Sequence, residues 1–72
     1  MAPVAPQRGQ LFVDEEGRRW IVDGVVHIRV AKRGGQFIVN LKGVADNTGE
    51  LVLSSADFFQ LLQRGALRQV YQ

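Results

Sequence analysis

The sequence contains no cysteine and only one histidine. Without cysteine the chain forms no disulfide and no thiolate metal site, and a single histidine excludes sites that need two. It also has no apolar run of about 18 residues, the length that a membrane-spanning helix requires. We therefore expect no metal, no cofactor and no membrane partner.

The chain is short and has an ordinary globular composition. Of its 72 residues, 46% are hydrophobic and 22% are charged, which indicates one small domain. A chain of this size buries about 60% of the surface that its unfolded form exposes, so its core is marginally stable. Since disulfides and metals are excluded, unusually good packing and self-association as a homodimer are the two remaining sources of stability.

Residues 1–9 are expected to form a flexible N-terminal tail, and residues 10–72 a single domain. Pro3 and Pro6 favour an extended conformation, and with Arg8 they give Pro-x-x-Pro-x-Arg, a spacing found in short ligands of adaptor domains. Residues 1–6 lack the basic start and the apolar stretch of a secretory signal. The expected location is therefore cytoplasmic.

Apolar and β-branched segments predict strands at residues 10–13, 18–22, 25–30, 36–41 and 51–53. Turn-forming residues separate them, at 14–17, 31–35 and 42–50. Asp23-Gly24 is compatible with a two-residue hairpin turn and with a bulge that bends one long strand. We favour the bulge because a hairpin at this point would crowd the strands, but the sequence leaves both open.

A helix is predicted at about residues 55–64. Ser54 can cap its first N–H groups while Asp57 reaches back to it, and Phe58, Leu61 and Leu62 follow helical spacing. Gly65 is a typical stop signal. Residues 66–71 are candidates for a final strand.

About five short antiparallel strands and one late helix predict a mainly β fold, a small SH3-like antiparallel β-barrel. A sheet with one helix packed across it, of the α+β class, is the alternative. Trp20, Phe37 and Phe58 are the expected core. Phe12 and Phe59 are out of phase with their apolar neighbours, so we expect one or both to be exposed on a contact surface.

Three apolar segments carry a resemblance to a known class of proteins. Gly17-x-x-Trp20-x-Val22, a hairpin that ends Val39-x-Leu41, and Leu53 followed by Phe58-x-x-x-Leu62 resemble small phage and prophage proteins with SH3-like barrels, many of unknown function. The resemblance covers most of residues 10–65 and consists of apolar spacing. It implies a small accessory protein that acts by binding, and it transfers no site residues.

Residues that could support catalysis have simpler structural explanations. Ser54 and Ser55 are explained by the helix cap, and His27 lies in the middle of a strand. The adjacent carboxylates of residues 14–16 fall in a turn, where charge is expected. We therefore expect no enzymatic activity.

The first functional hypothesis is a non-enzymatic protein-binding module, an accessory, adaptor or inhibitor. Exposed apolar and aromatic side chains framed by arginine are typical of interface anchors. The candidate surface comprises Phe12, Phe59, Arg64, Arg68 and Tyr71.

The alternative is a small nucleic-acid-binding β-barrel. The net charge is +2, and most of the nine basic residues are arginine, which binds phosphate with a planar fork. The candidate residues are expected to form one basic end of the central hairpin, where they would give modest and salt-sensitive affinity. They are Arg29, Lys32, Arg33 and Lys42.

Overall fold

The computed structural model describes residues 5–30, 33–45 and 49–70. Its elements are, in chain order, β1 (Leu11–Asp14), β2 (Arg19–Val30), β3 (Arg33–Gly43), β4 (Glu50–Ser54), α1 (Ser55–Arg64) and β5 (Leu67–Val70). The protein is therefore mainly β with one late helix, as the sequence predicts.

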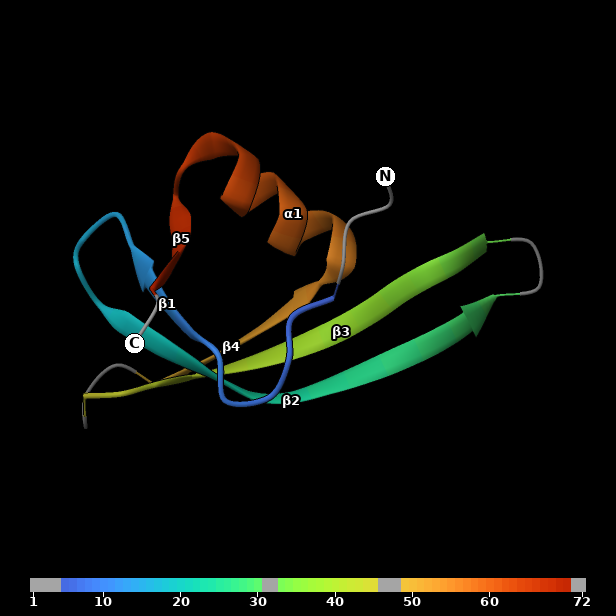
Figure 1. The fold of residues 1–72 in the computed structure, drawn as a ribbon, viewed down its shortest axis with the longest axis horizontal. Coiled ribbons are helices and arrows are strands. Elements are labelled where there is room, and N and C mark those ends of the chain that lie inside the picture. Colours follow the sequence, from blue (N-terminus) through green and yellow to red (C-terminus); the bar gives the residue numbers. More distant parts are fainter. Residues whose placement is uncertain (1–4, 31–32, 46–48, 71–72) are drawn as a thin grey trace.

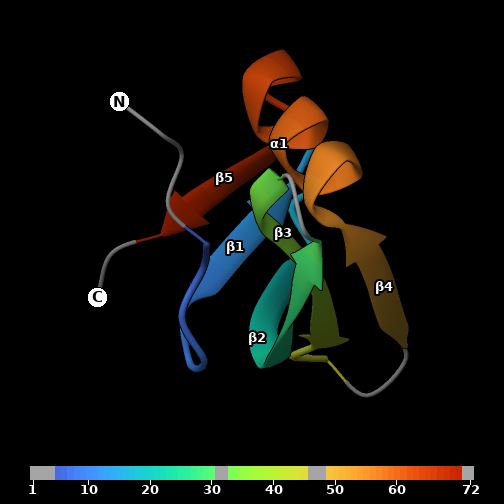
Figure 2. The ribbon, with the colours of Figure 1, turned by 90° about the vertical axis from the view of Figure 1, so that its right-hand side faces the viewer.

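The five strands form one antiparallel sheet in the order β4-β3-β2-β1-β5. The first four strands follow one another as a meander, and β5 returns to pair with β1 (Figure 1). The sheet curls into a half-barrel with α1 over its concave side, as Figure 2 shows. Because α1 packs against β3, β4 and β5, it bridges the two edge strands of the sheet.

Asp23-Gly24 forms a bulge and not a hairpin turn. β2 continues from Arg19 to Val30, and its register with β3 shifts between Val22 and Gly24. One extra residue bends a strand and increases its twist. The bulge therefore allows one long strand to pair with β1 at its start and to continue beside β3.

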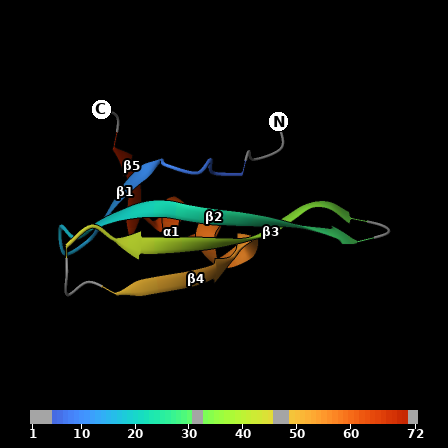
Figure 3. The same cartoon turned by 90° about the horizontal axis from the view of Figure 1, so that it is seen from below.

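β2 and β3 extend beyond the rest of the sheet as a two-stranded arm. β1 pairs with β2 only as far as Ile21, and β4 pairs with β3 only as far toward the arm as Ile38. Residues 33–35, which were expected in the turn, belong to β3. The arm lengthens the molecule to 39 Å, against 21 and 20 Å across (Figure 3).

The core lies between the concave face of the sheet and α1. The ring of Phe58 meets those of Phe12 and Phe37 edge to face, with centroids 5.4 and 6.0 Å apart, a geometry that aromatic quadrupoles favour. The predicted core residues are confirmed as buried. The full cluster is Phe12, Trp20, Val22, Phe37, Val39, Leu41, Phe58 and Leu67.

The predicted helix signals are present at both ends of α1. Ser54 Oγ accepts a hydrogen bond from the N–H of Asp57 at 3.2 Å. Gly65 has a φ of 77°, in the left-handed region, and its N–H donates to the carbonyl of Leu62 at 3.1 Å. The chain then turns into β5, which is the final strand that the sequence allowed.

Ala5 and Pro6, in the part of the chain expected to be a flexible tail, pack on the domain. Pro6 is buried and Ala5 packs against the core, while the N–H of Gly9 donates to the carbonyl of Val22 at 2.9 Å. Proline can be buried here without leaving a backbone donor unpaired, because it has none. Residues 1–4, with Pro3 of the proline motif, lie outside the described residues.

Asp14 anchors the turn between β1 and β2. Its Oδ1 accepts the N–H groups of Glu16 and Arg18 at 2.9 and 2.8 Å. Its Oδ2 accepts Arg18 Nε at 2.9 Å and the indole N–H of buried Trp20 at 3.1 Å. Partial burial raises the pKa of Asp14, but the hydrogen bonds from Trp20, Arg18 and Glu16 together outweigh it and hold the pKa below its usual value.

This network makes stability depend on pH. Since the pKa of Asp14 is lower in the folded than in the unfolded chain, its contribution is complete above the unfolded value and is lost as the pH falls through the folded value. We expect Asp14→Asn to unfold with about 1–2 kcal/mol less free energy at neutral pH, and to lose less further stability on acidification. Urea denaturation at about pH 6 and pH 2, followed by Trp20 fluorescence, measures this, and equal pH dependence in both chains would contradict it.

Candidate functional site

Phe12 is not part of an exposed surface, and its assignment to a protein-binding surface is wrong. Only 2% of the residue is exposed. Phe12 lies directly opposite Trp20 across β1 and β2, so both rings point to the concave side of the sheet. Leu11 and Val13, which the sequence pattern suggested as inward, alternate with Phe12 and therefore take the opposite, convex side.

The other residues of that predicted surface do not come together. Phe59 is half-buried, with its ring centroid 5.4 Å from that of Phe37, so it completes the edge of the core. Arg64 is exposed at the end of α1, with its Nη2 4.0 Å from Glu15 Oε1. Arg68 is exposed on β5, where it alternates with buried Leu67 and so takes the convex side. Tyr71 lies outside the described residues.

The predicted basic end of the hairpin is not formed as expected. Arg29 and Arg33 belong to the arm, and Lys32 lies outside the described residues. Lys42 pairs with Ile21 and Glu50 at the opposite end of β3. Because a strand rises about 3.3 Å per residue, the backbones of Arg33 and Lys42 are about 30 Å apart. Lys42 therefore cannot act together with the arm on one short stretch of phosphates.

The convex face of β2, β3 and β4 carries an apolar patch that sequence reasoning missed. Val26 lies opposite Ile38, and Val52 lies opposite Asn40. Val26 and Val52 are 64% and 67% exposed, and Ile28 and Ile38 are each 38% exposed. We call these four side chains the convex patch: Val26, Ile28, Ile38 and Val52.

The bulge explains why this patch faces outward. Before the bulge, even-numbered Trp20 and Val22 point to the core; after it, odd-numbered Val25 packs on the core and Val26 is exposed. A shift of one residue moves every later side chain of a strand to the other face. The available signal was Ile38, which is apolar but alternates with buried Phe37 and Val39.

The paired positions of the convex patch carry no charged residue, but charged residues border them on one side. Its three cross-strand rows hold only apolar and uncharged polar residues: Gly24, Asn40 and Val52; Val26, Ile38 and Ser54; Ile28 and Gln36. Exposed Asp23, the extra residue of the bulge, adjoins the first of these rows, and the next row holds Lys42 between Ile21 and Glu50. Within the rows, Asn40 Oδ1 is buried without a hydrogen-bond partner among the described residues.

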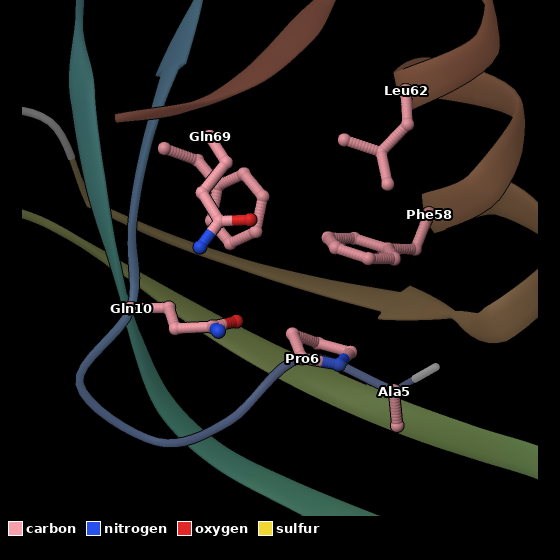
Figure 4. Close-up of a pocket in the computed structure, with 7 residues that line it drawn as sticks. Ala5, Pro6, Gln10, Phe58, Leu62 and Gln69 are labelled. Atoms are coloured by element: carbon pink, nitrogen blue, oxygen red, sulfur yellow. The ribbon is translucent and has the colours of Figure 1, made fainter. Parts of the chain in front are cut away.

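A second feature is a small cavity between residues 5–10, β5 and α1. It has a volume of about 150 Å³, and Gln10 and Gln69 extend into it beside Pro6 and Phe58 (Figure 4). Gln10 Oε1 is already engaged by the N–H of Gln7 at 2.9 Å. Small-molecule sites usually measure about 300–1,000 Å³, and this cavity has no charged lining residue. It is too small to be a separate ligand site.

The described residues contain no group of three His, Asp or Glu side chains that could hold a metal ion. His27 is exposed on the arm, with its ring centroid 6.3 Å from that of Phe37. In the part of the chain that the structure describes, no helix has the length and apolar character needed to cross a membrane.

Comparison with protein-family models, with curated proteins and with solved structures finds no match to this chain. The convex patch and the curled sheet must therefore be interpreted from their own residues. Among the large apolar side chains that the structure describes, the two most exposed are Val52 and Val26, and both belong to the convex patch.

The burial of the two adjacent phenylalanines gives a stability prediction. Phe58 is 1% exposed, so Phe58→Ala should lower the free energy of unfolding by about 3–5 kcal/mol, and Phe58→Leu by roughly 1–2 kcal/mol. Phe59→Ala should cost roughly 1–2 kcal/mol, because Phe59 is only half-buried. Urea denaturation measures all three variants. An unchanged stability in Phe59→Ala would instead support Phe59 as a contact residue.

Proposed function

We propose that this protein is a non-enzymatic binding module that docks on a protein partner through the convex patch. The observation that carries the proposal is the exposure of Val26, Ile28, Ile38 and Val52 together on one sheet face. Contiguous exposed apolar surface on a small domain is typical of interaction sites, because water contact with it is unfavourable.

The arm gives this proposal further support. A two-stranded hairpin on its own is at best marginally stable in water, and it needs another layer to cover its apolar side chains. Among the described residues, α1 covers the concave side at Phe37, but no element covers Val26 or Ile28 on the convex side. A partner on the convex side would supply the missing layer.

We also propose that the half-barrel is an SH3-like barrel. The support is its strand order, in which β5 returns beside β1 and the helix lies between β4 and β5. Phe37 and Phe58 fill the concave side of such a barrel, so binding falls to its outside. An accessory protein that acts by binding, as the resemblance to small phage proteins implies, needs no open cleft.

The nucleic-acid alternative has less support. Stacking on bases requires exposed aromatic rings. Among the described residues Phe12, Trp20, Phe37 and Phe58 are buried, and Phe59 is half-buried against Phe37.

Charge placed on the convex patch tests the proposal. Val52→Asp and Val26→Asp should reduce capture of the partner from a lysate of the source cells at least about tenfold, because an interface buries a lone charge at a cost of more than about 1.4 kcal/mol. Quantitative mass spectrometry of the captured proteins measures the effect. Both side chains are already exposed, so thermal melting should show a folded domain.

The matched control is Gln60→Asp, which adds the same charge at an exposed position of α1. Wild type and this control should capture the same protein in equal amounts. Equal capture by the convex variants would contradict the proposal.

A further inference from the structure

We infer that the partner of the convex patch is a second copy of this chain, which packs the same face against it around a two-fold axis. The inference rests on the proposed function, because both require the convex patch to be an interface. Two features favour a second copy: the absence of charge at the paired positions of the patch, and the pairing of charges at its border.

The absence of charge fits a face that meets itself. In a two-fold interface the same surface is used on both copies, so a charged group near the axis comes close to an identical charge. Such like-charge contacts are strongly unfavourable. The paired positions from Gly24 to Ile28 hold no charged residue on β2, β3 or β4, although 22% of the chain is charged. Exposed Asp23, the extra residue of the bulge, lies at their border, on the same side as Lys42 and Glu50.

The border of the patch is complementary to itself. Lys42 and Glu50 lie opposite each other on β3 and β4, in the row next to the patch. The ion pairs among the described residues join Arg18 to Asp14 and Glu16, and Arg64 to Glu15. Neither Lys42 nor Glu50 takes part in one of them. Around a two-fold axis, Lys42 of each copy can face Glu50 of the other, so one contact is made twice.

The small size of the domain gives self-association an energetic reason. The chain folds around few fully buried side chains, the largest of which are Phe37, Phe58, Leu41, Val22 and Val39. Covering Val26, Ile28, Ile38 and Val52 would add a second apolar layer between two sheets about 10 Å apart. The dimer would then be a sandwich whose outer layers are the two α1 helices.

The mass of the full chain in solution tests the inference. Sedimentation equilibrium from about 5 to 500 μM should show wild type approaching twice the 8.0 kDa of one chain. Val26→Asp should remain at 8.0 kDa over the same range, and Gln60→Asp should behave as wild type.

The absence of cysteine allows a direct test of the face. Ile38→Cys introduces one thiol on the convex patch, and Gln60→Cys introduces one on α1. A short bismaleimide should link two copies of the first variant at least several-fold more than the second. Adding Val26→Asp to Ile38→Cys should return the yield to that of the α1 control.

The outcomes separate this inference from the proposed function. A chain that is monomeric throughout, with no excess cross-linking at position 38, overturns the second copy as partner. If Val26→Asp then still abolishes capture of another protein, the patch is a binding site for that protein and the proposed function stands. If charge on the patch changes neither the mass nor the capture, both are wrong.

Discussion

The bulge at Asp23-Gly24 determines which side chains of β2 meet the core and which face outward. On its β1 side, Trp20 and Val22 are buried; beyond it, Val25 packs on the core and Val26 is 64% exposed. Without the extra residue the same strand would direct Val26 and Ile28 inward, because side chains alternate with a period of two. The outward direction of Val26 and Ile28 therefore follows from this one insertion, which also bends β2.

The core and the hydrogen bonds of Asp14 fit the alternation of inward and outward side chains that the bulge establishes. Trp20 lies opposite Phe12, and its indole N–H reaches Asp14 at 3.1 Å, so the buried ring has no unpaired donor. On the other side of the bulge, Phe37 is held between β3 and α1 by Phe58 and Phe59. Both groups of rings fill the concave side. The described aromatic rings are therefore used for the stability of the core.

Sequence reasoning succeeded where the signal is local. The bounds of α1 follow from Ser54, Asp57 and Gly65, which act within one helical turn of where they stand. The inward row of β3 follows from the alternation of Phe37, Val39 and Leu41, which is interrupted by polar residues only in part.

Sequence reasoning failed where a neighbouring strand decides which side chains of a strand face the core. Leu11, Phe12 and Val13 are all apolar, so alternation cannot say which of them is inward; the pairing of Phe12 with Trp20 decides it. In residues 25–30 apolar side chains occupy both faces, and only the bulge selects one. Lys42 was grouped with the arm because it is close in sequence, but an extended strand separates such residues by tens of ångströms.

An exposed apolar sheet face is also a risk, since it can stack on other apolar surfaces and cause aggregation. The sequence limits this risk at the borders of the convex patch. Glu50 and Lys42 close one end of it, and exposed Asp23 adjoins the same end. Charges along this border oppose unspecific stacking there, because burying an unpaired charge in an apolar contact is unfavourable. An apolar centre with a charged border is what the proposed interface requires.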